Sequence, residues 1–159
     1  MKIVKLFLVM ASLLCASPLY AGTFTLTGST SNSNPVADIK ANGKDTTQTV
    51  TSGSSVAITI TLDSGNKTGT AADWWVLYKD SSNAWKYYNL STMVSTTSVT
   101  TSPTYQGNLG TLATYTVLST TSLAAGTYTF YFGVDTTKDG VLTTGASNLF
   151  YDSISVVVQ

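Results

Sequence analysis

Apolar side chains occupy every second position between residues 56 and 62 of this chain. Val56, Ile58, Ile60 and Leu62 alternate with alanine and threonine, which is the pattern of a strand with one buried face. The same alternation returns roughly every ten residues between clusters of Gly, Asn, Asp and Ser, and no helical period persists after residue 21. The pattern predicts an all-β fold, an immunoglobulin-like two-sheet antiparallel sandwich of about seven to eight strands.

A short motif before the predicted sixth strand supports this fold. Leu123, Gly126 and Tyr128 in SLAAGTY have the spacing of a tyrosine corner, in which a tyrosine at the start of that strand bonds back to the preceding turn. The chain has a single cysteine, Cys15, so it lacks the cysteine pair of antibody domains. We therefore expect the sandwich to rest on packing and on hydrogen bonds within the sheets.

The first 21 residues have the features of a secretory signal peptide. Lys2 and Lys5 precede an apolar run, and Ala21 offers a small residue at the cleavage point, with Ala16 as the alternative. The run is shorter than the roughly 20 residues needed to cross a bilayer. We expect a secreted protein, periplasmic or extracellular, with no membrane insertion. The predicted units are a signal peptide at 1–21, a short N-terminal strand and flexible joint at 22–35, and the β-sandwich domain at 36–159.

The charged residues argue against several classes of function. Once Lys2 and Lys5 are removed, six of the eight basic residues remain, all lysines, against eight aspartates, and the chain has no histidine. No basic cluster is present for a nucleic acid, and the groups of Ser-His and Cys-His catalysis are missing. We expect no enzymatic activity, no catalytic residue and no nucleic-acid partner.

Residues 72–90, ADWWVLYKDSSNAWKYYNL, hold all three tryptophans of the chain. Successive side chains on a strand point to opposite faces, so the two strands of this hairpin each have a core face and an outer face. The predicted core set is Trp74, Val76, Tyr78, Tyr88 and Leu90. The predicted outer set is Trp75, Trp85 and Tyr87, together with Tyr131 from the sixth strand, which lies beside the third in such a sandwich. Exposed rings bind a protein partner or a glycan at the cell surface, or they only stabilise the sheet, and these interpretations stay open.

The segment DTTKDG at 135–140 has some features of an EF-hand calcium loop. Asp135 and Asp139 stand at its first and fifth places, but the third place is Thr137 and the twelfth is Ala146. A simple turn is the favoured interpretation, and Asp152 would be needed to complete a weak site. We expect no cofactor and no metal, with calcium as the alternative.

The N-terminal strand raises the alternative of self-assembly. Phe24 and Leu26 alternate with threonine, and such a strand can complete the sheet of a neighbouring subunit. Pairing with its own sheet is the default expectation.

Long segments of the chain resemble a family of secreted bacterial β-domains. They are PVADIKANGKD, TGTAADWWVLY, LAAGTYTFYFGVDTTKDGVL and LFYDSISVVV, and the resemblance covers residues 35–158. Asp139 with Gly140 stands where similar domains tend to have Asn-Gly. The resemblance implies a bacterial exported module with an immunoglobulin-like sandwich and no assigned activity. Our hypothesis is a module that acts through its surface, in adhesion or as the partner of an envelope protein, with a carbohydrate-binding domain and a fibre subunit as alternatives.

Overall fold

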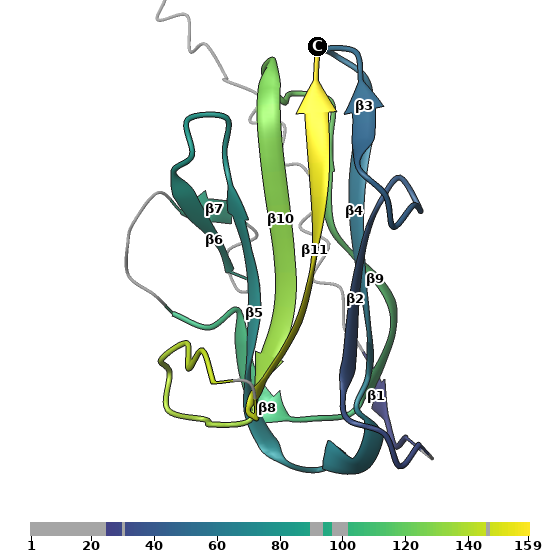
Figure 1. The fold of residues 1–159 in the computed structure, drawn as a ribbon, viewed down its shortest axis with the longest axis vertical. Coiled ribbons are helices and arrows are strands. Elements are labelled where there is room, and N and C mark those ends of the chain that lie inside the picture. The colour runs from purple at the N-terminus through teal and green to yellow at the C-terminus, as the bar shows by residue number, and fades with distance from the viewer. Residues whose placement is uncertain (1–24, 30, 90–93, 97–101, 146) are drawn as a thin grey trace, which may run out of the picture.

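A computed structural model describes residues 25–29, 31–89, 94–96, 102–145 and 147–159 of the chain. These residues form two facing β-sheets and one short 3-10 turn, Gly65–Lys67 (Figure 1). The strands are β1 (Leu26–Thr27), β2 (Val36–Ala41), β3 (Gln48–Val50), β4 (Val56–Asp63), β5 (Ala71–Lys79), β6 (Trp85–Asn89), β7 (Val94–Thr96), β8 (Tyr105–Asn108), β9 (Thr111–Thr120), β10 (Gly126–Asp135) and β11 (Leu149–Val158).

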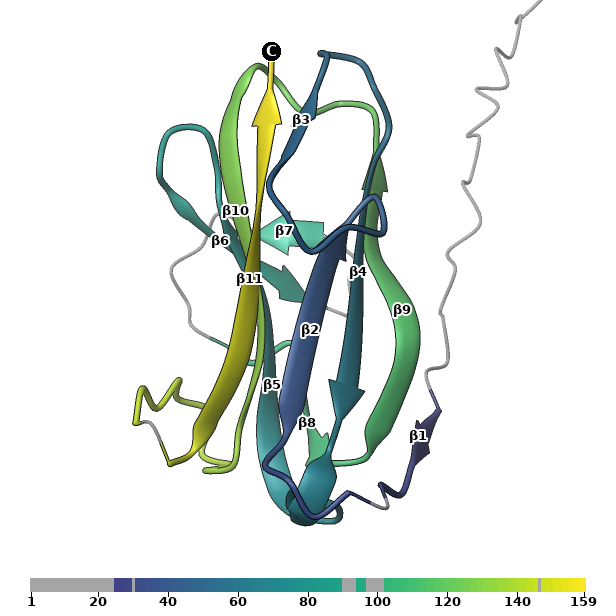
Figure 2. The ribbon, with the colours of Figure 1, turned by 45° about the vertical axis from the view of Figure 1, so that its right-hand side comes forward.

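The strand order is that of an immunoglobulin-like sandwich. The smaller sheet runs β1-β9-β4-β2, and the larger runs β3-β11-β10-β5-β6-β7, with β8 also paired to β5. All pairs are antiparallel except β3 with β11. Figure 2 shows β2, β4 and β9 side by side in front of the larger sheet. The predicted fold class is therefore confirmed, with four strands of two to four residues in addition to seven longer ones.

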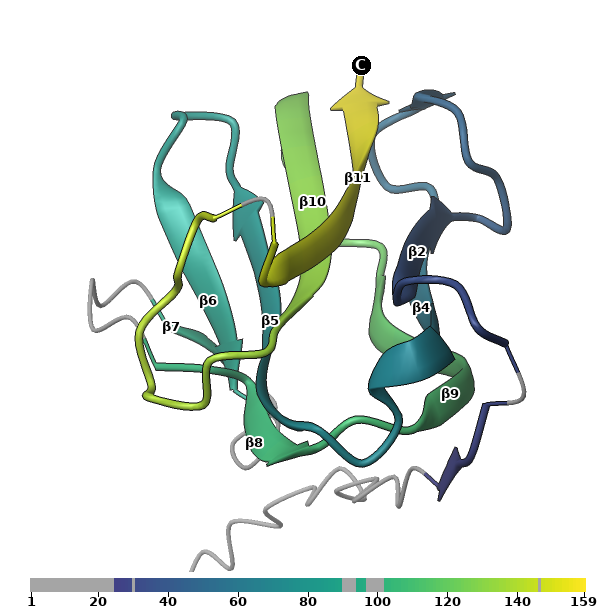
Figure 3. The same ribbon diagram turned by 60° about the horizontal axis from the view of Figure 1, so that its bottom comes forward.

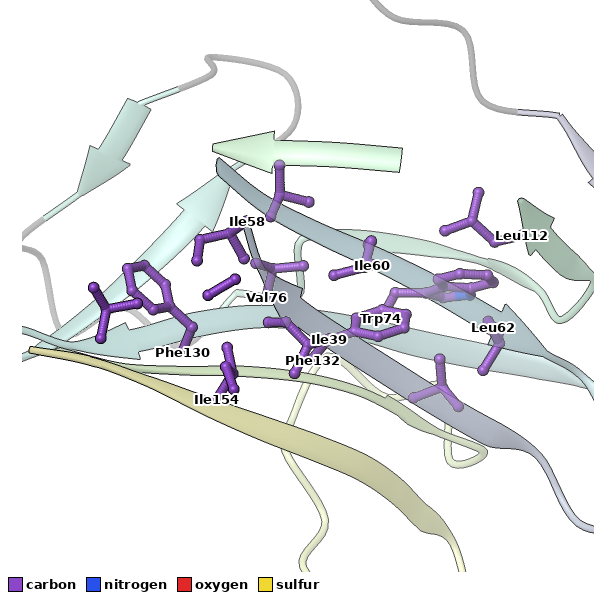
Figure 4. Close-up of a cluster of buried hydrophobic side chains, with 14 of the residues drawn as sticks. Ile39, Ile58, Ile60, Leu62, Trp74, Val76, Leu112, Phe130, Phe132 and Ile154 are labelled. Atoms are coloured by element: carbon purple, nitrogen blue, oxygen red, sulfur yellow. The ribbon is translucent and has the colours of Figure 1, made fainter. Parts of the chain in front are cut away.

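The core fills the space between the two sheets. In β4 the alternation predicted from the sequence is observed, since Val56, Ile58, Ile60 and Leu62 are all buried. Side chains of the larger sheet meet them, among them Trp74 of β5 (Figure 4). Each such side chain contributes about 1.5–3 kcal/mol when it leaves water. The other labelled partners in Figure 4 from the larger sheet are Val76, Phe130, Phe132 and Ile154.

The predicted tyrosine corner is present at the start of β10. The Tyr128 hydroxyl donates a hydrogen bond of 3.1 Å to the carbonyl oxygen of Ala124, and the Tyr128 ring is buried in the core. One side chain thus ties the turn before β10 to the interior of the sandwich.

The N-terminal strand belongs to the sandwich. Leu26 pairs with Leu112 of β9, as the default expectation has it, while Phe24 lies outside the described residues. The joint predicted to be flexible is hydrogen-bonded to the turn after β4: Ser29 Oγ donates to the Asp63 carboxylate, and the Asn66 amide donates to the Ser33 carbonyl. β1 is therefore an edge strand of the smaller sheet.

The segment 91–113 contributes to both sheets. Within its described part, β7 pairs with β6, β8 pairs with β5, and β9 already begins at Thr111. At the other end of the chain, β11 lies between β10 and β3, and its residues Val156 and Val158 are buried. The C-terminal strand is thus part of the core structure.

Candidate functional site

The candidate site lies on the outer side of the larger sheet. Trp74 and Val76 of β5 point into the core, so Trp75 and Leu77 point outward. The register pairs Leu77 with Tyr131 of β10 on one side and with Tyr87 of β6 on the other. Three neighbouring strands therefore place their outward side chains on one surface.

Exposed Trp85 and half-buried Tyr131 form the centre of this surface. Their ring centroids are 5.3 Å apart at an interplanar angle of 46°, and Trp85 is 42% exposed. The prediction that Tyr131 joins Trp85 on the outer side is confirmed. The Lys79 ammonium lies 4.8 Å from the Trp85 ring centroid, a cation–π contact that occupies part of the indole surface.

The turn between β5 and β6 holds Trp85 in place. One Asp80 carboxylate oxygen accepts hydrogen bonds from the Ser82 hydroxyl (2.6 Å), from the Ser82 amide and from the Ala84 amide (both 2.9 Å). The Ser82 hydroxyl, with the Ala84 amide next in effect, lowers the pKa of Asp80 from 3.8 to about 2. The other oxygen lies 3.4 Å from Lys86 Nζ. This short-range set of bonds fixes the hairpin that presents Trp85.

Tyr87 was also predicted on this surface, whereas Tyr151 was not. Tyr87 is half-buried beside Leu77. Tyr151 of β11, absent from the prediction, is 63% exposed and pairs in register with Gly133, diagonally next to Tyr131. The same period of two would have found it, because Tyr151 alternates with the buried side of β11. Of the predicted core residues, Tyr78 stacks on Phe130, Leu90 lies outside the described residues, and the Tyr88 side chain is also outside them.

We call the surface made by Trp85, Tyr87, Tyr131 and Tyr151, with Lys79, the outer aromatic face.

Trp75 was predicted on this exposed surface, and that prediction is wrong. Its side chain points outward but is only 2% exposed. The loop between β10 and β11 runs back past the outer side of β5 and β8 (Figure 3). It is bonded to Asp73, the outward residue two positions before Trp75. The loop therefore lies against this end of the sheet, and we attribute the burial of Trp75 to it.

Two buried aspartates hold the covering loop. Asp73 of β5 and Asp135 of β10 face each other in register, and both are 0% exposed. Like charges in such a pair repel, but here amides surround them. Asp135 accepts hydrogen bonds from the amides of Thr137 (2.8 Å) and Thr143 (2.7 Å). The two carboxylates act as internal acceptors for the amides of this loop.

Of these two aspartates, Asp73 makes the contacts that reach farther along the chain. One oxygen accepts hydrogen bonds from the amides of Asp139 (3.1 Å) and Gly140 (2.6 Å). The other oxygen accepts a bond of 2.7 Å from Gln106 Nε2 of β8. Trp75 Nε1, beneath the same loop, has no acceptor among the described residues. Such a donor costs about 1–3 kcal/mol, which the Asp73 bonds must offset.

The three carboxylates considered for calcium are not brought together. Asp135 is engaged by loop amides, and Asp139 accepts a bond of 2.9 Å from the Val141 amide in its own turn. Asp152 points to the opposite side of the sheet, where it accepts a bond of 3.1 Å from the Ile39 amide of β2. In the part of the chain that the structure describes, no three His, Cys, Asp or Glu side chains are grouped for a metal. The hydrogen bonds fit the turn interpretation.

A small apolar pocket lies inside the sandwich. Its volume is about 20 Å³, which is room for about one water molecule. The lining includes Ile60, Trp74, Leu112 and Phe132, all of them core residues. The pocket is a packing defect of the core and is too small for a ligand.

The outer aromatic face therefore belongs to an immunoglobulin-like β-sandwich. No known protein-family profile matches the chain, and no curated protein matches it. Among solved structures, the chain is similar to the CARDB domain of the PF1109 protein from Pyrococcus furiosus, crystallised in complex with di-metal ions. The two are 15% identical over 79% of this chain and 94% of that one, with a TM-score of 0.43. A likeness of this degree carries no argument about ligands or function.

No helix among the described residues is long and apolar enough to cross a membrane.

Proposed function

We propose that the protein is an exported, non-catalytic β-sandwich module of bacterial origin that binds a protein partner through the outer aromatic face. The observation that carries the proposal is the contact of exposed Trp85 with half-buried Tyr131, at a ring distance of 5.3 Å. Tryptophan and tyrosine supply much of the binding energy at protein interfaces. Here they stand on β6 and β10, which both pair with β5. The sheet holds both side chains in place, so little conformational entropy is lost when a partner binds.

A protein partner fits this surface better than a sugar. Stacking on a sugar needs a flat and open ring face. The Trp85 ring has Lys79 over it and Tyr131 tilted against it, and Trp75 is buried. A mixed surface of rings and one ammonium group is typical of the contact region between proteins. Carbohydrate binding remains the second candidate because Tyr151 is 63% exposed.

The residue types support a role without catalysis. The chain has no histidine, and its acidic groups are all aspartates. The two aspartates that are buried side by side, Asp73 and Asp135, accept hydrogen bonds from loop amides. Export to the periplasm or beyond rests on the N-terminal segment, whose charge and apolar run have the form of a signal peptide.

Binding of the labelled protein to intact bacterial cells tests the proposal. We expect Trp85→Ala combined with Tyr131→Ala to lose binding while circular dichroism shows a folded sandwich. Val36→Ala is the matched control, because Val36 is an equally exposed apolar residue, at 55%, on β2 of the other sheet. Binding by the double variant equal to that of the control would refute the proposal.

Treatment of the cells before binding separates the two candidate ligands. Protease treatment should abolish binding to a protein partner, whereas periodate oxidation of sugars should leave it intact. The opposite pattern would favour the carbohydrate alternative.

A further inference from the structure

β9 lies near one edge of the smaller sheet, whereas the outer aromatic face lies on the larger sheet. β4 pairs with one side of β9. On the other side β1 pairs only through Leu26 with Leu112 and Thr27 with Thr111. No other strand in the described part of the chain pairs with that side, because β7 and β8 both join the larger sheet. Immunoglobulin sandwiches of the constant type have a full strand at this place.

The chemistry of this edge differs from that of the opposite edge. Strands at edges are usually protected by charges, prolines or bulges. β2, the opposite edge, carries Lys40, whose ammonium lies 2.7 Å from Asp45 and 3.5 Å from Asp38. From residue 109 to residue 123, around β9, there is no charged residue and no proline. Two register shifts with β4 are the protection that β9 has.

The N-terminal strand fits the start of β9 specifically. Leu26 packs against the hydrophobic core. A Cβ at Gly110 would lie 2.6 Å from Leu26 Cβ and 3.2 Å from the Thr27 carbonyl oxygen. The missing side chain at Gly110 is therefore what makes room for β1. The space beside Gly110 and the register of β1 with β9 show that the β9 edge accepts the segment that contains Leu26 and Thr27.

The contacts of β1 are few and transferable. Pairing stops at Leu112, where the first register shift between β4 and β9 follows. Residues 22–34 before and after β1 contain no charge and no proline, and the bonds that hold this segment to its own sandwich include those of Ser29 with Asp63 and of Ser33 with Asn66. The seven residues 28–34 span at most about 25 Å when extended, which is enough to reach a neighbouring sandwich.

We infer that the N-terminal strand of one chain occupies the β9 edge of a second copy, so that the protein self-associates by strand exchange. The same contacts form within one chain and between two, so exchange has a low cost. Because each chain donates at one place and accepts at another, the contact is heterologous and can continue into a fibre.

Disulfide trapping between two singly labelled chains tests the inference. Full chains carrying Cys15→Ser are exported from a bacterial host, one with Thr27→Cys and the other with Thr111→Cys, the two residues that pair in β1 and β9. The mixture is incubated at increasing concentration and oxidised. We expect a disulfide-linked dimer of the two chains on non-reducing gels, increasing with concentration.

The controls make every outcome decisive. Thr27→Cys mixed with Ser119→Cys, at the far end of β9, should give no dimer, and Leu26→Asp in the donating chain should abolish the dimer of the matched pair. A chain with both Thr27→Cys and Thr111→Cys that closes only on itself at all concentrations, with no dimer from the matched mixture, would overturn the inference. That result would not affect the proposal that the outer aromatic face binds a partner, because partner binding is measured in a separate experiment.

Discussion

Replacing Asp73 by alanine should release the loop that covers Trp75. The change removes the acceptor of three hydrogen bonds, from the amides of Asp139 and Gly140 and from Gln106 Nε2. Gln106 is exposed, so its side chain regains water at little cost. The two amide bonds to a charged acceptor contribute at least about 1.5 kcal/mol each. The expected loss is therefore about 3 kcal/mol in the free energy of unfolding.

Two measurements check this loss. A loss of that size should lower Tm by about 10 °C in a domain of this length. Acrylamide should also quench tryptophan emission more strongly, and Trp75→Phe in the same background should remove the added quenching. Asp73→Asn should be milder than Asp73→Ala, because its amide oxygen still accepts the two loop bonds.

The matched control is Asp139→Ala. Asp139 is exposed, and among the described residues its carboxylate accepts a bond only from the Val141 amide within the turn. Two results together would contradict this account: the same Tm for Asp73→Ala and Asp139→Ala, and no more quenching of tryptophan emission in Asp73→Ala than in the unaltered protein. The Asp73 carboxylate would then not hold the loop, and the burial of Trp75 would have another cause.

Three further predictions concern the hairpin, the corner and a close strand contact. Because the pKa of Asp80 is lowered from 3.8 to about 2 in the folded chain, its stabilising contribution is complete above pH 3.8 and is lost as the pH falls through 2; denaturant unfolding of Asp80→Asn should lack this dependence. Tyr128→Phe removes the 3.1 Å bond to Ala124 and should cost about 1 kcal/mol, with exposed Tyr151→Phe as the neutral control in thermal unfolding. Gly133→Ala should lower stability by about 1–3 kcal/mol, since its Cβ would lie 2.8 Å from Tyr151 Cβ; an unchanged Tm would contradict this.

Local patterns predicted most of the framework. The alternation in β4, the order of buried and outward residues in β10 and the tyrosine corner all depend on neighbours within a few positions. The contact of Trp85 with Tyr131 also followed, because a sandwich of this class sets β10 beside β5. These features are repeated along the sequence or are common to the fold class, so one chain is enough to find them.

The sequence did not predict what covers each surface. The loop beside Trp75 is held by hydrogen bonds from the amides of Asp139 and Gly140 to Asp73, which comes 66 and 67 positions earlier in the chain. No periodic signal in the sequence marks such a pair. The position of β1 beside β9 was also not predicted from the sequence, because it depends on the missing side chain of Gly110 just before β9. Asp135, one of the three candidate calcium ligands, accepts hydrogen bonds from the amides of Thr137 and Thr143, and the second of these partners is brought to it only by the folded loop.

The sequence by itself therefore determined on which side of the sheet each ring of the aromatic hairpin points, because the pleat of a strand alternates side chains with a period of two. Only the tertiary structure decided which of those rings reaches solvent. Trp75 and Trp85 both point outward, yet Trp75 is 2% exposed and Trp85 is 42% exposed. We attribute the difference to Asp73, whose buried carboxylate accepts hydrogen bonds from the amides of Asp139 and Gly140 and so holds a loop at that end of the face.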